Sequence, residues 1–582
     1  MNRKQRRATR KAGPPATGVS ERGDLQVGKL LFEAAERERA GKLDDAARIY
    51  RRALILEPDH AEASNNLGRV LLAQGKTAEA SASFARSLAL MPQLLKQYSA
   101  ICATLVALLP PLKEALRRQT SAWPRRLSER DLLDDDGVAA IADDPLLLYL
   151  MHSVPMQDVA FERLLTALRA SLLESARAGR KISAAILNFA CALAQQCFIN
   201  EYIFATTTEE DAQVDQLKSA LELALSARSP VEPIQLAVLA MYQPLNAWAP
   251  APILLDGSWP PSIDDVLTRQ LREPLQERAL RDCVPRLTAI DDKISKSVQQ
   301  QYEENPYPRW LHAARQMAQI PIDQYLREQF PTSAFTSTGK ADHLDMLIAG
   351  CGTGEIAIAS VQKYSGAQAL AIDLSLSSLC YARRSTPTEV APRIEYAQAD
   401  ILNLAAIGRS FDAIDASGVL HHMADPLEGW RILLGLLRPS GLMHLGLYSE
   451  AGRQDVAAAR AFIAERGFGS TAAEIRRCRQ ELLKTPLAGV TRFADFFSTS
   501  ECRDLLFHVQ EARMTIPAIR NFLAAHDLRF IGFEFDPAAA QRYCSQFAAS
   551  GWSITDLNRW HDIETRFPDT FSGMYHFWVQ KT

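Results

Sequence analysis

The stretch Leu344-Asp-Met-Leu-Ile-Ala-Gly350-Cys-Gly-Thr-Gly-Glu355-Ile-Ala-Ile decides the fold. The apolar run before Gly350 predicts a buried strand, because short apolar runs bounded by turn residues are typical of one. The residues after Glu355 predict a helix. A strand, a glycine turn and a helix form a nucleotide-binding unit, because glycine lets the backbone approach a ligand and the helix end presents free N–H groups.

The spacing of the glycines indicates the kind of ligand. A dinucleotide site has the pattern GxGxxG, with room for a pyrophosphate on the helix end. This chain has GxGxG instead, followed by Glu355 in the first turn of the helix. A carboxylate there repels a pyrophosphate and tolerates a ligand that carries positive charge. The spacing therefore disfavours a nicotinamide dinucleotide and a hydride-transfer reaction.

Two further predicted strands end in acids. The strand Ala369-Leu-Ala-Ile ends at Asp373, 19 residues after Gly354, where a carboxylate can accept hydrogen bonds from both hydroxyls of a ribose. The strand that begins at Ile394 ends at Asp400, where a carboxylate suits an adenine amino group and the neighbouring Ile401 suits its ring. An exposed strand-end acid without a ligand remains the alternative for each.

The order of motifs from 344 to 450 resembles one enzyme family. GCGTGE, AIDLS, QADI, FDAIDASGVLHHMADP and LRPSGLMHLGLYS together resemble the class I S-adenosylmethionine-dependent methyltransferases. The resemblance implies an α/β Rossmann-like domain with a mixed seven-stranded sheet, S-adenosyl-L-methionine as cofactor, and methyl transfer to an acceptor that the sequence does not identify. It places this domain at 296–450 and 528–582, with 451–527 as a helical insertion that forms a substrate or lid region.

The resemblance also assigns residues to the cofactor. The glycines would wrap its amino acid part, Asp373 its ribose, and Asp400 with Ile401 its adenine. The complete expected set is Gly350, Cys351, Gly352, Gly354, Asp373, Leu374, Asp400, Ile401 and Ser417. A catalytically inactive adaptor that keeps the methyltransferase fold is the alternative function.

The acceptor side is less well defined. Methyl transfer is an in-line displacement, so a base is needed only when the nucleophile arrives protonated. His421, His422 and Tyr448 follow the carboxyl ends of strands and are weak candidates, while a pair of histidines that only orients the loop or cofactor is favoured. Tyr302 and Tyr307, in QYEENPYPRW, are candidate lid residues, or parts of a rigid proline turn. This short segment also looks like those of bacterial protein-lysine methyltransferases.

The insertion contributes two further candidates for acceptor selection, Phe493 and His508. His508 shares one face of a predicted helix with Glu501, Asp504 and Glu511. A polar substrate wall or a metal site is possible there, but a solvated face of an amphipathic helix is favoured.

The front of the chain repeats itself every 34 residues. Gly41, Ala46, Tyr50, Ala53 and Pro58 recur as Gly75, Ala80, Phe84, Ser87 and Pro92. This pattern resembles tetratricopeptide repeats, which stack as helical hairpins. We expect repeats with a capping helix over 25–118, and either a groove for a protein or peptide partner or a docking and dimerisation module. Residues 119–295 are predicted to be helical and have no assigned role.

Composition limits the remaining classes. The net charge of −3 argues against a nucleic-acid-binding surface, which needs a basic face. Nine scattered cysteines without CxxC spacing predict a reduced, cytoplasmic setting and no metal site. No apolar run is long enough for a membrane span. The basic tail over 1–24 is predicted to be disordered, with an acidic partner or RNA as the alternative; oligomeric state stays open.

Overall fold

The computed structural model describes residues 20–311, 318–535 and 537–582. The chain divides into two compact units: Met1–Ala115 with Leu133–Tyr149, and Leu116–Leu132 with Leu150–Thr582. Most of the predicted basic tail, residues 1–19, lies outside the described residues, and helix α1 begins at Ser20.

Helical hairpins form the front of the first unit. Helices α1 (Ser20–Arg39) and α2 (Leu43–Leu56) make one pair, and α3 (Ala61–Ala73) and α4 (Thr77–Leu90) make the next. Gly41 and Gly75 turn between the paired helices at φ +72° and +73°, a region that glycine enters without strain. A Cβ on Gly68 would lie 3.0 Å from the ring of Phe84, which explains the small residue where these helices cross. The predicted repeats are confirmed as helical hairpins.

Helices continue up to the glycine-rich strand. Those that follow the repeats are α5 (Tyr98–Leu108), α6 (Pro110–Ala122), α7 (Glu129–Leu132), α8 (Asp135–Ala142) and α9 (Pro145–Ser153). The second unit then adds α10 (Val159–Arg177), α11 (Ala184–Ile199), α12 (Thr208–Ser226), α13 (Pro233–Ala240), α14 (Pro261–Leu267), α15 (Glu273–Leu280) and α16 (Lys293–Glu304). Within the part of the chain that the structure describes, no single helix is long and apolar enough to cross a membrane; α5 and α6 reach that length only as a bent pair.

A seven-stranded mixed sheet forms the centre of the second unit. Its strands are β1 (Leu344–Ala349), β2 (Ala367–Asp373), β3 (Ile394–Gln398), β4 (Phe411–Ser417), β5 (Leu437–Tyr448), β6 (Leu528–Phe533) and β7 (Met574–Lys581). Their order is β3-β2-β1-β4-β5-β7-β6, and β7 runs antiparallel to both of its neighbours. The predicted Rossmann-like fold with a mixed seven-stranded sheet is confirmed. The strand order reverses between β1 and β4, where such sheets bind ligands at the carboxyl ends.

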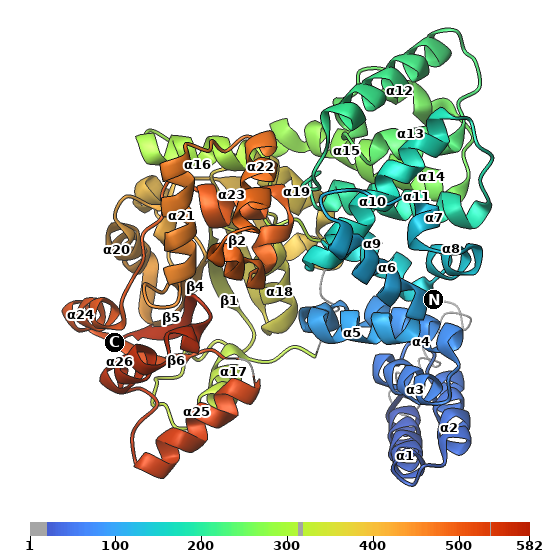
Figure 1. Cartoon of the computed structure of the whole chain (residues 1–582). Coiled ribbons are helices and arrows are strands. Elements are labelled where there is room, and N and C mark those ends of the chain that lie inside the picture. Colours follow the sequence, from blue (N-terminus) through green and yellow to red (C-terminus); the bar gives the residue numbers. More distant parts are fainter. Residues whose placement is uncertain (1–19, 312–317, 536) are drawn as a thin grey trace, which may run out of the picture. The chain divides into compact units, whose positions relative to one another are not determined.

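Helices cover both faces of this sheet (Figure 1). Buried residues of α17 (Ile322–Gln329), α18 (Glu355–Lys363) and α19 (Leu376–Ser385) pack on one face. Those of α20 (Pro426–Leu436), α24 (Ile516–Ala525) and α26 (Leu557–Arg566) pack on the other, where Trp430 stacks on Phe522 with ring centroids 4.1 Å apart. Trp560 and Phe571 belong to this core, whereas Trp552 and Phe567 are 40% and 61% exposed.

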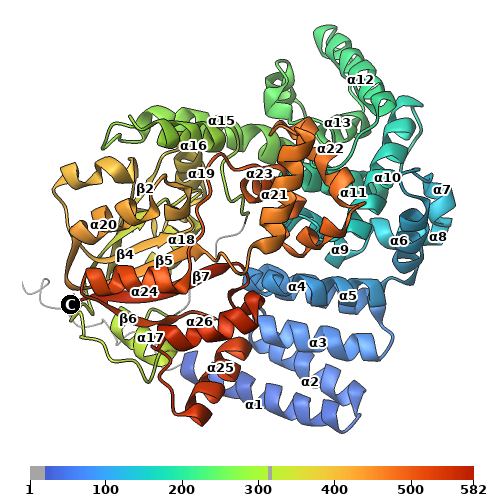
Figure 2. The same ribbon diagram turned by 60° about the vertical axis from the view of Figure 1, so that its left-hand side comes forward.

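The insertion between β5 and α24 consists of α21 (Gln454–Arg466), α22 (Ala472–Leu482) and α23 (Thr499–Phe507), and α25 (Pro537–Ser550) lies between β6 and α26. Figure 2 shows α22 beside the helices that precede the sheet. Arg479 on α22 and Glu162 on α10 form a buried ion pair with an N–O distance of 2.7 Å. The insertion is therefore tied to the helical region.

Candidate active site

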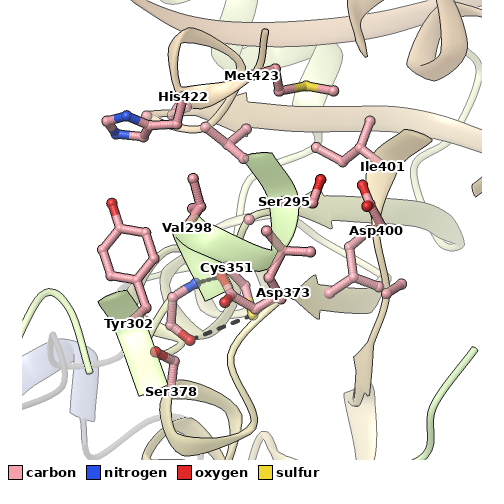
Figure 3. A pocket seen from close by; sticks show the side chains of 18 of the residues that line it. Ser295, Val298, Tyr302, Cys351, Asp373, Ser378, Asp400, Ile401, His422 and Met423 are labelled. Atoms are coloured by element: carbon pink, nitrogen blue, oxygen red, sulfur yellow. Dashed lines mark hydrogen bonds between the residues drawn. The ribbon is translucent and has the colours of Figure 1, made fainter. Parts of the chain in front are cut away.

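A cavity of about 350 Å³ opens at the carboxyl ends of the central strands (Figure 3). The residues named from the sequence that line it are Tyr302, Tyr307, Gly350, Cys351, Gly352, Glu355, Asp373, Leu374, Asp400, Ile401, Ser417 and His422. Gly354, His421, Tyr448, Phe493 and His508 do not line it. In Figure 3, Asp400 and Ile401 lie at one end, and Tyr302 and His422 lie at the other.

The glycine bend forms the floor of this cavity. Gly350, Gly352 and Gly354 have φ values of +72°, +52° and +90°, which side-chain-bearing residues rarely adopt. A Cβ on Gly350 would lie 2.5 Å from Val419, and one on Gly352 would lie 2.5 Å from the carbonyl oxygen of Tyr307. The bend is therefore packed against its neighbours and presents backbone to the cavity.

Asp373 points toward this bend. Its Oδ2 accepts a hydrogen bond from the Gly352 N–H at 2.9 Å, and its Oδ1 accepts one from the Ser375 N–H at 2.8 Å. Burial raises the pKa of this carboxyl to about 6, against the effect of these amides. Each oxygen keeps a lone pair for a further donor. The carboxylate is thus held in place, with acceptor capacity left for a ligand.

Asp400 has one oxygen that is poorly satisfied. Its Oδ1 accepts a hydrogen bond from the Leu402 N–H at 3.0 Å, whereas Oδ2 is buried and receives no hydrogen bond of good geometry from the described residues. Burial raises the pKa of this carboxyl, although the Ser295 side chain lies close enough to lower it. Leaving a buried acceptor unpaired costs about 1–3 kcal/mol, so the geometry fits a ligand that brings a hydrogen-bond donor.

The two adjacent histidines differ completely. His421 is fully buried, stacks on Tyr448 with ring centroids 3.6 Å apart, and has no hydrogen-bond partner for either ring nitrogen among the described residues. Burial holds the pKa of His421 well below its usual value, so the ring is neutral. His422 lines the cavity, and its Nδ1 lies 3.1 Å from the carbonyl oxygen of Gln510. His421 serves packing, and His422 faces the ligand space.

Side chains of the insertion stand directly behind this end of the cavity. The Tyr302 hydroxyl donates a hydrogen bond to Asp504 Oδ1 at 2.5 Å, and the Tyr448 hydroxyl donates to Oδ2 at 3.3 Å. The rings of His422 and His508 stack with centroids 3.7 Å apart. The insertion therefore supplies the second layer of the cavity wall.

These contacts correct one expectation about the insertion. The favoured solvated helix face is wrong, because Asp504 and His508 are 3% and 2% exposed. Helix α23 also ends at Phe507, so His508 and Glu511 lie beyond it. Glu511 accepts a hydrogen bond from Arg453 at 3.0 Å, and Phe493 lies against Arg492 outside the cavity.

The ligand atoms of His422, Asp504 and His508 lie within 4.8 Å of one another, a spacing that would suit a metal ion. The hydrogen bond made by His508 argues against a metal ion at this position. The backbone N–H of Gln510 donates to His508 Nδ1 at 3.1 Å, and burial lowers the pKa of His508 to about 3. A neutral ring that accepts at Nδ1 carries its proton on Nε2, the nitrogen that would have to bind the metal.

A second network under the cavity has no signal in the sequence. His444 Nδ1 lies 2.8 Å from Asp415 Oδ2, and His444 Nε2 lies 3.4 Å from Glu534 Oε2. Burial by itself would lower the pKa of His444, but the two carboxylates raise it to about 10. The Ser417 hydroxyl is 3.1 Å from His444 Nδ1, which connects this network to the cavity wall. Only the pairing of β4 with β5, and the return of the chain after β6, brings these residues together.

Comparisons with known proteins agree with this architecture. Residues 347–445 match the family described as methyltransferase domain, and residues 33–94 match the tetratricopeptide repeat. An uncharacterized protein of Synechococcus sp. is 29% identical over 268 residues, which cover 42% of this chain and 61% of that protein. The matched part therefore spans less than two thirds of that relative.

Solved structures are similar to parts of this chain at low identity. PKMT2 from Rickettsia typhi, also solved in complex with AdoHcy, is 16% identical, with a TM-score of 0.35 over 44% of this chain and 52% of that one. An S-adenosylmethionine dependent methyltransferase from Mesorhizobium loti is 16% identical, with a TM-score of 0.24 over 44% of this chain and 96% of that one. By its family matches and its sheet order, this chain contains a class I methyltransferase domain with a tetratricopeptide repeat region ahead of it in the sequence.

Proposed function

We propose that this domain binds S-adenosylmethionine in the cavity at the glycine bend and catalyses methyl transfer from it. The observation that carries the proposal is the pair of acids on one cavity wall. Asp373 keeps acceptor capacity beside the bend, and the buried Oδ2 of Asp400 receives no hydrogen bond of good geometry from the described residues. An adenosine has a pair of ribose hydroxyls and an amino group that match these acceptors.

Different residues along the cavity would contact different parts of the cofactor. Asp373 would accept hydrogen bonds from the ribose hydroxyls, and Asp400 would accept one from the adenine amino group, with Ile401 against the ring. Glu355, in the first turn of α18, lines the same cavity and favours a cationic ligand over an anionic one. When bound, the cofactor supplies an electrophilic methyl group on a positively charged sulfur.

The remaining end of the cavity is left for the acceptor. Tyr302, Tyr307 and His422 form that end, with Asp504 behind Tyr302. Because an in-line displacement depends mainly on position and exclusion of water, a closed aromatic wall is suited to it. We also propose that the repeat region recruits a protein that carries or delivers the acceptor, since stacked helical hairpins present extended binding surfaces.

Two measurements test the proposal. Isothermal calorimetry of the full chain should show binding of S-adenosylmethionine and none of NAD. Radiolabelled S-adenosylmethionine, incubated with the protein and a cell extract, should then label one of the protein, lipid, nucleic-acid or small-molecule fractions. Tight cofactor binding with no labelled fraction would favour the inactive adaptor, and absence of cofactor binding would refute the proposal outright.

A further inference from the structure

The backbone of Gln510 forms hydrogen bonds with two histidines and thereby determines whether Nδ1 of each ring carries a proton. The Gln510 carbonyl oxygen lies 3.1 Å from His422 Nδ1, so that nitrogen must carry a proton to donate. The Gln510 N–H lies 3.1 Å from His508 Nδ1, so that nitrogen must be bare. Nδ1 is therefore protonated on His422 and unprotonated on His508. In its neutral form His422 has its free lone pair on Nε2, whereas His508 carries its proton there.

Within the described part of the chain, no hydrogen bond engages Nε2 of His422. The carboxylate oxygen Oδ1 of Asp504 lies 3.7 Å from this nitrogen, which is beyond hydrogen-bonding distance. While His422 is neutral, its Nε2 and the Asp504 carboxylate are both hydrogen-bond acceptors and cannot bind each other. Once Nε2 takes up a proton, the same carboxylate stabilises the new charge. His422 is therefore an acceptor of protons with a counter-ion already in place.

Asp504 keeps its charge in this interior position. Burial opposes ionisation of Asp504, whereas a protonated His422, the hydrogen bond from Tyr302 and the charge of Arg453 lower the pKa of this carboxyl. While both histidine rings are neutral, the hydrogen bond from Tyr302 and the charge of Arg453 remain to favour the ionised form. Arg453 is also paired with Glu511, so one arginine faces two acids. The Tyr302 end of the cavity therefore has a negative field behind an aromatic wall, formed by the rings of Tyr302 and Tyr307 with centroids 6.1 Å apart.

We propose that His422 is the catalytic base and that the methyl acceptor is an amine, an inference that rests on the proposed function. Among methyl acceptors that arrive with a proton on the reacting atom, the negative charge of Asp504 favours an amine. A hydroxyl or a thiol would have to become an anion beside Asp504, which costs free energy. An ammonium is attracted by the same carboxylate and by the faces of Tyr302 and Tyr307.

The step balances without another reactant. The ammonium transfers one proton to His422 Nε2, and the lone pair set free on nitrogen forms the new N–C bond. The C–S bond of the cofactor breaks and its electron pair stays on sulfur. His422, now an imidazolium held by Asp504, returns its proton to water as the methylated ammonium leaves.

The first experiment identifies the chemistry of the product. Wild-type protein, radiolabelled S-adenosylmethionine and cell extract are incubated, and poly-L-lysine and a mixture of small primary amines are tested as separate acceptors. The expected label survives both mild alkali and acid hydrolysis, as N-methyl groups do; its place in protein or in small molecules separates the two sources of amine. Label that is released by alkali, as a methyl ester is, would overturn the amine.

The second experiment tests His422 through pH. His422→Asn should lower the single-turnover rate by about 100-fold to 10,000-fold at pH 7 while its affinity for S-adenosylmethionine stays within about twofold. The deficit should shrink toward pH 10, because an amine then arrives unprotonated and needs no base. The groups that face His422 are Tyr302, His421, Tyr448, Asp504 and His508, and they are present in both proteins. His561→Asn, on the exposed side of α26, is the control and should behave as wild type.

A deficit that is the same at every pH would mean that His422 only supports the wall and would overturn its role as base. Loss of activity with EDTA and recovery with zinc would replace the base by a metal ion. Absent cofactor binding in wild-type protein, or binding with no labelled acceptor, would instead refute the proposed function.

A third measurement does not depend on activity. Nitrogen NMR of full-length protein with ¹⁵N-labelled histidine should show His422 as the Nδ1–H tautomer at pH 7.5, assigned by the signal missing from His422→Asn. A proton on Nε2, or an imidazolium at that pH, would remove the basis of the proposal even if activity were lost in the variant.

Discussion

At the scale of single residues, Asp373 is the clearest test of the cofactor site. Asp373→Ala removes an acceptor that two backbone amides hold at the glycine bend. Loss of charged hydrogen bonds should weaken S-adenosylmethionine binding by about 1–3 kcal/mol, measured by calorimetry. Glu395→Ala, which changes an exposed acid of β3, is the matched control and should bind as wild type. If Asp373→Ala bound S-adenosylmethionine with unchanged affinity, the ribose could not be bound by Asp373.

The raised pKa of Asp373 makes the same contact sensitive to pH. The pKa of this carboxyl is about 6 in the empty protein, and the ionised form is the better acceptor for two hydroxyls. The dissociation constant should therefore be flat from pH 8 to pH 7 and rise below pH 6, by up to about tenfold per pH unit. Calorimetry from pH 8 to pH 5 measures this slope. Asp373→Asn cannot titrate and should lack it; a slope that persists in this variant would assign it to another group.

Between elements, the buried network around His444 links β4, β5 and the chain after β6. Its folded pKa of about 10 lies above the ordinary value of 6.5. The stabilisation is therefore complete below about pH 6.5 and is lost as the pH rises through 10. His444→Gln should lower the free energy of unfolding by about 3–5 kcal/mol at pH 6.5, because the buried carboxylate of Asp415 and the partly buried one of Glu534 lose their cation. Urea denaturation of both proteins should show this difference shrinking toward pH 10, and a constant difference would contradict the charged pair.

A second contact between elements holds the insertion to the helical region. Arg479 on α22 and Glu162 on α10 are 0% and 5% exposed at their side chains. Arg479→Met should destabilise the second unit by about 3–5 kcal/mol, because it leaves a buried carboxylate unpaired. Adding Glu162→Leu should recover most of that loss, measured by urea denaturation. A double variant as unstable as the single one would show that the arginine acts through packing on Phe496, which lies 4.3 Å below it, and not through its charge.

At the scale of the whole molecule, the sequence predicts those features that local pattern determines. The glycine bend, the strand-end acids and the repeat period could be predicted because each follows from residues close together in the chain. The second wall of the cavity could not. Asp504 and His508 lie about 200 residues from their partner Tyr302, and the spacing of α23 alone suggests a solvated face. Likewise nothing local distinguishes His421 from His422; only the position of Gln510 does.

The division of the chain into two units leads to a prediction about its unfolding. Each unit has its own buried core, and the proposed cofactor residues all belong to the second unit. A ligand stabilises the unit that binds it, by about 2.7 kcal/mol when its concentration is 100 times the dissociation constant. Scanning calorimetry with S-adenosylmethionine should therefore show one transition that moves upward and one that does not. Asp373→Ala should lose the shift without changing the unshifted transition. A single transition that moves as a whole would show that the two units unfold together, and that the repeats and the methyltransferase domain form one cooperative body.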